Sequence, residues 1–213
     1  MRTVTTSIIL LLGSIVLNAQ SSENYLETVI GLSFYNEDLA IVSQDVVLPE
    51  AFQPEDYFRF QVIPKVSFPI NNSKLVVGPH LGYGYERFKI AEQNNEIVNR
   101  NLYKIGGHAQ YEKFNIYGLK PYIEIGANYN VYQTSNNAVV SDNQTVDYWK
   151  SYVDIGLRVR ASESLDVSLL FKDFATYHSD SRNFERVDGF TLGPFLNNFI
   201  QFPHFSVRYM LSK

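Results

Sequence analysis

Residues 57–86, YFRFQVIPKVSFPINNSKLVVGPHLGYGYE, alternate apolar and polar side chains on both sides of the polar segment 71–73. The apolar positions before that segment are Phe58, Phe60, Val62, Pro64, Val66 and Phe68, and those after it are Leu75, Val77, Pro79, Leu81, Tyr83 and Tyr85. A period of two is typical of a β-strand with one apolar face and one polar face. Two such runs around a polar turn predict an antiparallel hairpin.

The same alternation recurs through most of the chain, for example in 122–131, 152–160 and 204–211. No segment after residue 22 keeps a helical period for three turns, so the chain is predicted to be all-β. We expect eight strands, at about 25–35, 57–69, 74–88, 100–113, 120–133, 147–160, 164–175 and 198–211. Their lengths reach or exceed the ~9–11 residues with which a tilted strand crosses a membrane.

The expected connections alternate in length along the chain. The long ones are 36–56, 89–99, 134–146 and 176–197, and the short ones are 70–73, 114–119 and 161–163. This alternation is typical of an antiparallel up-and-down transmembrane β-barrel with short periplasmic turns and long extracellular loops. Because the strand number is even, both termini are expected on the periplasmic side.

The two faces of the expected strands differ in kind. The polar face combines charges of both signs with small residues, namely Gly31, Gly78, Gly82, Gly106, Gly126 and Gly156. Such a face suits the narrow interior of an eight-stranded barrel, which side chains fill. The other face is aliphatic or aromatic, so it is expected to contact outer-membrane lipid.

Aromatic residues are abundant, with 15 Tyr, 15 Phe and a single Trp. In membrane barrels they form girdles at both membrane–water interfaces. The aromatic residues expected near the outer rim are Phe34, Phe58, Tyr83, Tyr85, Tyr129 and Trp149. Those expected near the periplasmic rim are Phe68, Tyr111 and Tyr209.

The first residues have the pattern of a secretory signal peptide, with a cationic start at Arg2 and an apolar run from Ile8 to Leu17. We therefore expect residues 1–20 to be removed and residues 21–213 to form one outer-membrane barrel domain. The formal net charge of −4 gives no sign of a nucleic-acid partner. The absence of cysteine excludes disulfides and thiolate metal sites.

The polar face predicts a charged network inside the barrel. Its expected members are Glu27, Arg59, Lys65, His80, His108, Glu124, Asp154, Arg158, Asp166 and Arg208. Counting from the turns places Arg158 opposite Asp166, and barrel closure places Arg208 near Glu27. The same count places Glu124 diagonal to Asp154 and to Arg158. Since eight strands leave no aqueous channel, the network is expected to be a salt-bridged plug and not a pore.

Histidines supply the other candidates for chemistry. His80 and His108 are expected opposite each other, but two imidazoles without a clear third ligand predict no metal, and no cofactor is expected. The sequences His178-Ser179-Asp180-Ser181 and His204-Phe205-Ser206 resemble the His-x-Ser of lipid A deacylases of the PagL type. A triad also needs an acid that orients the histidine, so no catalytic residue is predicted.

The stretch Phe60–Tyr85 resembles strands two and three of small porin-like outer-membrane β-barrel proteins, which are similar to the transmembrane domains of OmpA and OmpX. Pro64 and Lys65 match the family's pattern, while Ser67 and Phe68 stand where Gly and Tyr are common. The final strand, FSVRYMLSK, resembles the signal read by the barrel-assembly machinery, although it ends in Leu211-Ser212-Lys213. The resemblance implies a monomeric outer-membrane barrel, and the family has no catalytic motif.

The sequence therefore predicts an integral outer-membrane barrel with a structural, adhesive or surface-protective role and no enzymatic activity. Two alternatives stay open. One is a secreted or periplasmic lipocalin-like barrel that binds a small apolar ligand with an inward apolar face. The other is an outer-membrane enzyme similar to the lipid A deacylases. The extracellular partner of the long loops has no signature in the sequence.

Overall fold

The computed structural model describes residues 24–36, 54–70, 73–90, 96–136, 144–179, 189–192 and 203–211. The expected signal peptide lies outside these residues. The strands are β1 (Asn24–Asn36), β2 (Pro54–Pro69), β3 (Leu75–Ile90), β4 (Glu96–Tyr111), β5 (Leu119–Asn136), β6 (Gln144–Arg160), β7 (Leu165–Ser179), β8 (Gly189–Leu192) and β9 (His204–Leu211). Within the described residues, no helix is long and apolar enough to cross a membrane.

The strands form one closed antiparallel sheet. Each strand from β1 to β7 pairs with the next one along the chain, and β9 lies between β7 and β1 and closes the barrel. The predicted all-β, eight-stranded, up-and-down barrel is therefore confirmed. The short strand β8, which pairs with the outer part of β7, is an addition inside the expected loop 176–197.

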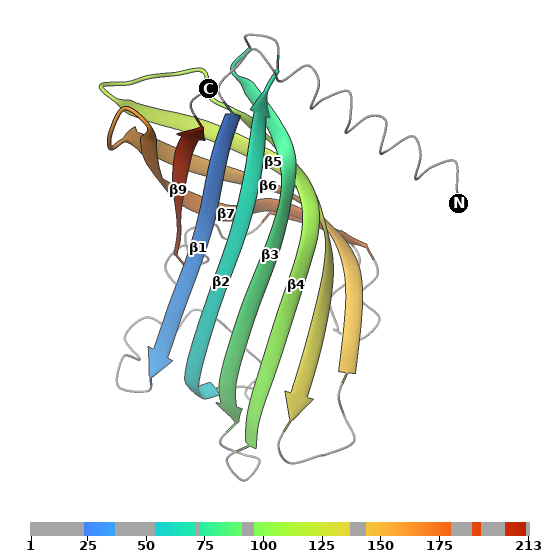
Figure 1. Ribbon diagram of the computed structural model, residues 1–213. Coiled ribbons are helices and arrows are strands. Elements are labelled where there is room, and N and C mark those ends of the chain that lie inside the picture. The colour runs from blue at the N-terminus through green and yellow to red at the C-terminus, as the bar shows by residue number, and fades with distance from the viewer. Residues whose placement is uncertain are drawn as a thin grey trace, which may run out of the picture.

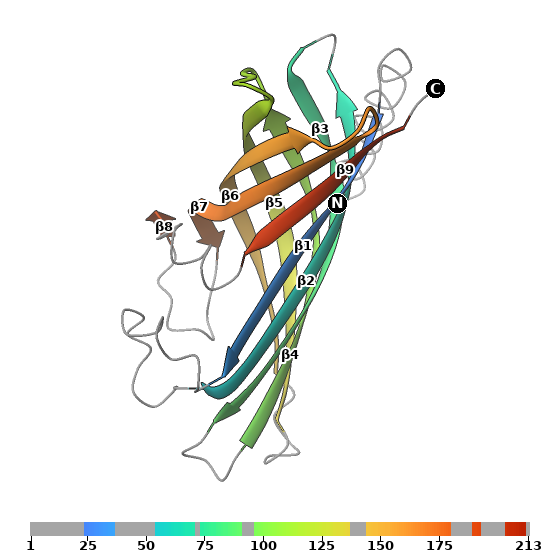
Figure 2. The same cartoon turned by 90° about the vertical axis from the view of Figure 1, so that its left-hand side faces the viewer.

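One end of the barrel carries the short turns, the start of β1 and the end of β9 (Figure 1). At the other end, β1 to β4 extend further than β7 and β9, so the strand ends are staggered (Figure 2). We name the end with the short turns the periplasmic end and the opposite end the outer end, after the orientation that the sequence predicts.

Several strands extend further towards the outer end than the sequence predicted. β4 begins at Glu96, β5 ends at Asn136 and β6 begins at Gln144. The connection 91–95 is therefore no longer than the turn 112–118, and the strict alternation of loop length was wrong at this point. Backbone pairing does not need apolar side chains, so the ladder continues through polar pairs such as Asn99 with Ser135. The expected start of the last strand, 198–202, lies outside the described residues.

The apolar face points outward, away from the barrel interior. Large side chains such as Leu81, Ile105, Ile123, Ile125 and Phe205 are at least half exposed, with exposed fractions of 50–57%. The buried apolar cluster is small and consists of Val29, Ile63, Tyr122 and Leu170. This arrangement contradicts the lipocalin-like alternative, which requires an apolar interior. It is the arrangement of a barrel whose outer surface contacts lipid.

A β-bulge interrupts the pairing of β6 with β7. Val153 pairs with Ala175 and Ile155 pairs with Phe171, so residues 172–174 face the single residue Asp154. Asp173 has a left-handed φ of 62°, and its backbone N–H donates a hydrogen bond of 2.7 Å to Asp154 Oδ1. Bulges often redirect side chains, and here two successive side chains, Lys172 and Asp173, reach charged groups of the interior.

Candidate functional site in the barrel interior

Four ionisable residues meet at the centre of the interior, and each is at most 2% exposed. Lys65 Nζ on β2 lies 2.5 Å and 2.6 Å from the two carboxylate oxygens of Glu124 on β5. Arg158 Nη2 on β6 lies 3.4 Å from Glu27 Oε2 on β1. In neither pair are the two strands neighbours in the sheet, so both ion pairs cross the lumen.

Gln110 on β4 joins the two ion pairs. Its Nε2 donates to Glu27 Oε2 at 2.9 Å and to Glu124 Oε2 at 2.8 Å. Its Oε1 accepts a hydrogen bond of 3.1 Å from Arg158 Nη2. We name these five residues, Glu27, Lys65, Gln110, Glu124 and Arg158, the central network. Its two carboxylates balance its two cations, which meets the requirement that buried charges be paired.

Two tyrosines and a serine complete the surroundings of the central network. Tyr152 Oη donates to Glu124 Oε1 at 2.8 Å, and Arg158 Nε donates to Ser168 Oγ at 3.0 Å. The guanidinium carbon of Arg158 lies 4.2 Å from the centroid of the Tyr122 ring, a cation–π contact. Sequence reasoning missed Gln110 and both tyrosines as members of the site, although all three alternate in phase with the polar face.

Glycines make room for these tyrosines. Gly126 lies opposite Tyr152, and Gly156 lies opposite Tyr122 on the neighbouring strand. A Cβ at Gly156 would lie 2.1 Å from Tyr122 Cζ, and a Cβ at Gly126 would lie 2.5 Å from Tyr152 Cζ. The two tyrosine rings therefore lie over positions of the neighbouring strand where a side chain would overlap them.

A second group of charges lies towards the periplasmic end. Arg208 Nη2 lies 2.5 Å from Asp166 Oδ2 and 3.7 Å from Glu112 Oε2. Glu112 also lies 2.5 Å from Arg158 Nη1, which links this group to the central network. Arg160 Nε lies 3.3 Å from Asp166 Oδ1 and is half exposed.

The predicted pairings were correct in part. Arg208 lies opposite Glu27 across β1 and β9, as predicted, although its ion pair is with Asp166. The pairing of Arg158 with Asp166 was wrong, because Arg158 lies opposite Ser168 and Arg160 lies opposite Asp166. The chain reverses around Glu163 and not around Ser162, which shifts the register by two residues.

Glu124 and Asp154 also differ from the expected arrangement. They lie directly opposite each other on β5 and β6, where a diagonal relation was predicted. Glu124 is neutralised by Lys65 across the lumen, while Asp154 Oδ2 lies 3.8 Å from Lys172 Nζ. Arg59, nearer the outer end, pairs with Glu86 at 2.8 Å.

His80 and His108 lie diagonally across β3 and β4, and not opposite each other as predicted, because His80 faces Gly106 and His108 faces Gly78. Their ring centroids are 5.7 Å apart. His80 Nε2 is hydrogen-bonded to Asn128 Oδ1, and His108 Nε2 lies 2.9 Å from Ser67 Oγ. Within the described part of the chain, no group of three or more His, Asp or Glu residues is placed to hold a metal ion.

The predicted interface aromatics lie on the outward face wherever their side chains are described. Tyr83, Tyr111, Trp149 and Tyr209 are 40–57% exposed. Phe58, Phe68, Tyr85 and Tyr129 are partly exposed, and the side chain of Phe34 lies outside the described residues. The ring centroids of Tyr129 and Trp149 are 5.4 Å apart across β5 and β6.

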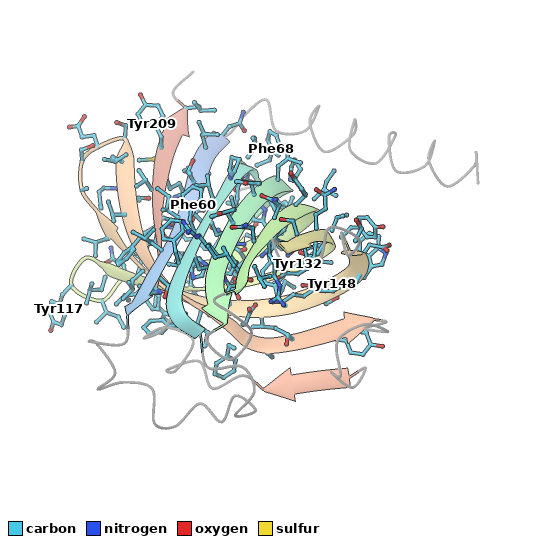
Figure 3. The ribbon with its side chains drawn as sticks, turned by 90° about the horizontal axis from the view of Figure 1, so that it is seen from below. Phe60, Phe68, Tyr117, Tyr132, Tyr148 and Tyr209 are labelled. Atoms are coloured by element: carbon cyan, nitrogen blue, oxygen red, sulfur yellow. The ribbon has the colours of Figure 1, made fainter. Side chains whose placement is uncertain are left out.

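Other exposed aromatic residues were not predicted as interface residues. Tyr103 is 45% exposed, and its ring centroid lies 5.6 Å from that of Tyr83. Tyr177 is 51% exposed on β7, and Tyr117 projects from the turn 112–118 (Figure 3). The outward parity of Tyr103 in its strand was the signal that could have identified it.

The two histidine–serine motifs occupy different places. His178 and Ser179 end β7, but their side chains, like all of Asp180 and Ser181, lie outside the described residues. His204 and Ser206 lie on the inner face of β9, with exposed fractions of 4% and 0%. His204 Nε2 lies 3.2 Å from Gln61 Oε1 in a hydrogen bond.

Comparisons with known proteins gave likenesses to solved structures alone. No protein-family model and no curated protein matches the sequence. Neisserial surface protein A is 13% identical, with a TM-score of 0.45 over 88% of this chain and 97% of that chain. A major outer membrane protein from Thermus thermophilus is 10% identical, with a TM-score of 0.49 over 88% of this chain and 99% of that one. The outer membrane enzyme PagL is 12% identical, with a TM-score of 0.40 over 89% and 99% of the two chains.

The barrel has two properties of a membrane-spanning structure. A closed antiparallel barrel satisfies its backbone hydrogen bonds internally, which a membrane-spanning structure requires. Its outward face carries exposed aliphatic and aromatic side chains, while the charges of the central network lie inside. The chain is therefore a closed antiparallel β-barrel with the outward surface of a membrane-spanning barrel.

Proposed function

We propose that this barrel is a non-enzymatic surface protein with a sealed interior and a structural, adhesive or surface-protective role. In this proposal residues 1–20 are a signal peptide, both termini lie in the periplasm and the long loops are extracellular. The barrel is a monomer that is surrounded by outer-membrane lipid. The barrel-assembly machinery inserts the barrel into this membrane. These loops carry the contacts with partners, since binding residues concentrate on loops held by a rigid scaffold.

The observation that carries the sealed interior is the central network. Its ion pairs join β2 to β5 and β1 to β6, so they span the lumen in two directions. Lys65, Glu124, Arg158 and Glu27 have exposed fractions of 0–2%, which supports a lumen that is closed to water at this level. An ion that crossed the barrel would have to break at least one of these buried pairs.

The sealed interior predicts that the protein does not conduct ions. Purified protein inserted into a planar lipid bilayer is expected to give no stable single-channel current at either polarity. Insertion is checked in the same sample by the shift in electrophoretic migration between heated and unheated protein. Stable conductance steps from inserted protein would contradict the proposal and would require a wider or oligomeric pore.

The non-enzymatic role is supported by the burial of His204 and Ser206 inside the barrel, where a lipid acyl chain does not reach them. Expression of the protein in a Gram-negative host is therefore expected to leave the mass of lipid A unchanged, as measured by mass spectrometry. Loss of an acyl chain that disappears with Ser206→Ala, Ser179→Ala or Ser181→Ala would instead favour the deacylase-like alternative.

A further inference from the structure

The turn 112–118 joins β4 to β5 at the periplasmic end and carries three large apolar side chains. Phe114, Ile116 and Tyr117 have exposed fractions of 60%, 55% and 102%. Tyr117 is therefore as exposed as a tyrosine in an extended peptide, and no described part of the barrel covers its ring. Figure 3 views the barrel from its outer end and shows Tyr117 at the edge of the molecule, apart from the other labelled aromatic residues.

The other two short turns at this end have a different composition. Residues 71–74 read NNSK and residues 161–164 read ASES, so both turns consist of polar or small residues. Polar residues are the usual choice for a turn that faces water. The turn 112–118 departs from its two neighbours, which indicates that its surroundings are not water alone.

The backbone of this turn is fixed by its own hydrogen bonds. Ile116 N–H donates to Leu119 O at 2.8 Å, and Leu119 N–H donates to Ile116 O at 3.0 Å. Between them, Tyr117 and Gly118 have φ values of 52° and 87°, the left-handed values of a type I′ turn. Asn115 Oδ1 accepts a hydrogen bond of 2.9 Å from Gly118 N–H. The turn therefore presents Tyr117 from a defined backbone.

The requirements of the turn do not explain the tyrosine at position 117. A left-handed φ favours glycine, asparagine and aspartate, and a bulky residue in that conformation is an outlier. Exposure of the ring to water is unfavourable as well. Backbone strain of this kind is often kept where a side chain serves a function. The position and exposure of Tyr117 therefore point to a contact outside the protein.

The outward apolar face of the barrel continues directly into the turn. Tyr111 ends β4 and Leu119 begins β5, with exposed fractions of 46% and 41%. Ile123, which lies opposite Tyr111, is 50% exposed. The apolar side chains of the turn thus extend the surface that contacts lipid and do not form a separate patch.

Lysines accompany these apolar side chains. Lys113 is exposed, and its Nζ lies 5.8 Å from the centroid of the Phe114 ring. Lys74 in the neighbouring turn is also exposed, and its carbonyl accepts a hydrogen bond of 3.1 Å from Glu112 N–H, which holds the two turns together. Apolar and aromatic groups flanked by lysine are typical of segments that lie at a membrane surface.

We propose that the turn 112–118 is an anchor that inserts Phe114, Ile116 and Tyr117 among the phospholipids at the membrane–water interface. A tyrosine ring suits this level because its body is apolar and its hydroxyl is polar. The ammonium group of Lys113 lies at the level of the phosphates, with its apolar stem along the lipid. This inference rests on the membrane location contained in the proposed function, but it holds for either orientation of the barrel.

The test places a single tryptophan in the turn and measures which quenchers reach it. Phe114→Trp is combined with Trp149→Phe, because Trp149 is the only tryptophan of the chain. The protein is folded into phosphatidylcholine vesicles whose acyl chains carry bromine close to the glycerol. The matched control is Ser162→Trp with Trp149→Phe, since Ser162 is exposed in the polar turn at the same end. The probe at position 114 is expected to be quenched several-fold more by the brominated lipid, and several-fold less by acrylamide in the water, than the control.

A second variant separates the anchor from the lipid affinity of the probe itself. Ile116→Ser and Tyr117→Ser are added to the Phe114→Trp probe, which keeps the tryptophan and removes its two apolar neighbours. Because interfacial binding scales with the buried apolar area, quenching by the brominated lipid is expected to fall several-fold and quenching by acrylamide to rise.

The proposal is overturned if acrylamide quenches the probe as strongly as the control, or if the two serine substitutions leave the quenching unchanged. Protection from both quenchers would also overturn it, because a second copy of the chain would then cover the turn. Heat-modifiable migration shows that each variant is inserted and folded. Failure of the wild-type protein to insert would contradict the membrane location itself, so the location and the anchor can fail separately.

Discussion

Replacement of Arg158 by methionine is expected to lower the free energy of unfolding by about 3–5 kcal/mol, the cost of breaking a buried ion pair by removing one partner. Arg158 is 0% exposed and contacts Glu27, Gln110, Glu112 and Ser168. Its loss would leave Glu27 as a buried carboxylate without its arginine. Urea titration in lipid vesicles measures the effect, and the fluorescence of the single tryptophan, Trp149, reports unfolding.

The control is Arg160→Met, which removes the same group from the same strand at a half-exposed position. It is expected to cost no more than about 1 kcal/mol, as for exposed ion pairs. Glu27→Gln combined with Arg158→Met should recover part of the stability, since it also removes the uncompensated charge. Equal losses for Arg158→Met and Arg160→Met would show that the central network does not stabilise the barrel.

Introduction of arginine at Ile125 is expected to cost about 2–4 kcal/mol, the penalty for a cation on the lipid face near the bilayer midplane. Ile125 lies on the outward face in the middle of β5 and is 54% exposed. In an outer-membrane barrel this exposed surface is in contact with hydrocarbon, where a guanidinium loses its hydration. The same urea titration in vesicles measures the change.

Two controls on β5 separate lipid exposure from other effects. Leu119→Arg places the same charge on the periplasmic end of the strand and is expected to cost about 0–1 kcal/mol, because the interface is hydrated. Asn128→Ala alters the inner face, where Asn128 is hydrogen-bonded to His80, and is expected to cost less than Ile125→Arg. If Leu119→Arg were as costly as Ile125→Arg, the depth assigned to Ile125 in the membrane would be wrong.

The barrel was predictable because its main determinant is local. Alternation with a period of two recurs in every long strand, and it assigns each side chain to one of two faces. From the order of residues alone, that alternation places Glu27, Lys65, Glu124 and Arg158 on one common face. It could not place them in contact, since Lys65 and Glu124 are 59 positions apart on strands that do not pair.

The alternation of apolar and polar residues could not predict the register between β6 and β7 or the position of the bulge in β7. A shift of the turn centre from Ser162 to Glu163 moves every pair between β6 and β7 by two residues. A shift by two residues keeps the same face inward, so the alternation does not distinguish the two registers. No glycine in the sequence marks the position of the bulge at Asp173. Aspartate is, however, one of the residues that tolerate a left-handed φ.

The central network has a consequence for the order of events in membrane insertion. Arg158 and Glu27 are separated by 131 positions, and β1 joins the rest of the barrel on its second side only through β9, the last strand of the chain. An open sheet that had already entered the hydrocarbon would present these ionised groups to lipid without their partners, at a high cost in desolvation. We therefore expect the groups to keep their water until the first and last strands meet, so that closure of the sheet and expulsion of water from its lumen occur as one cooperative step.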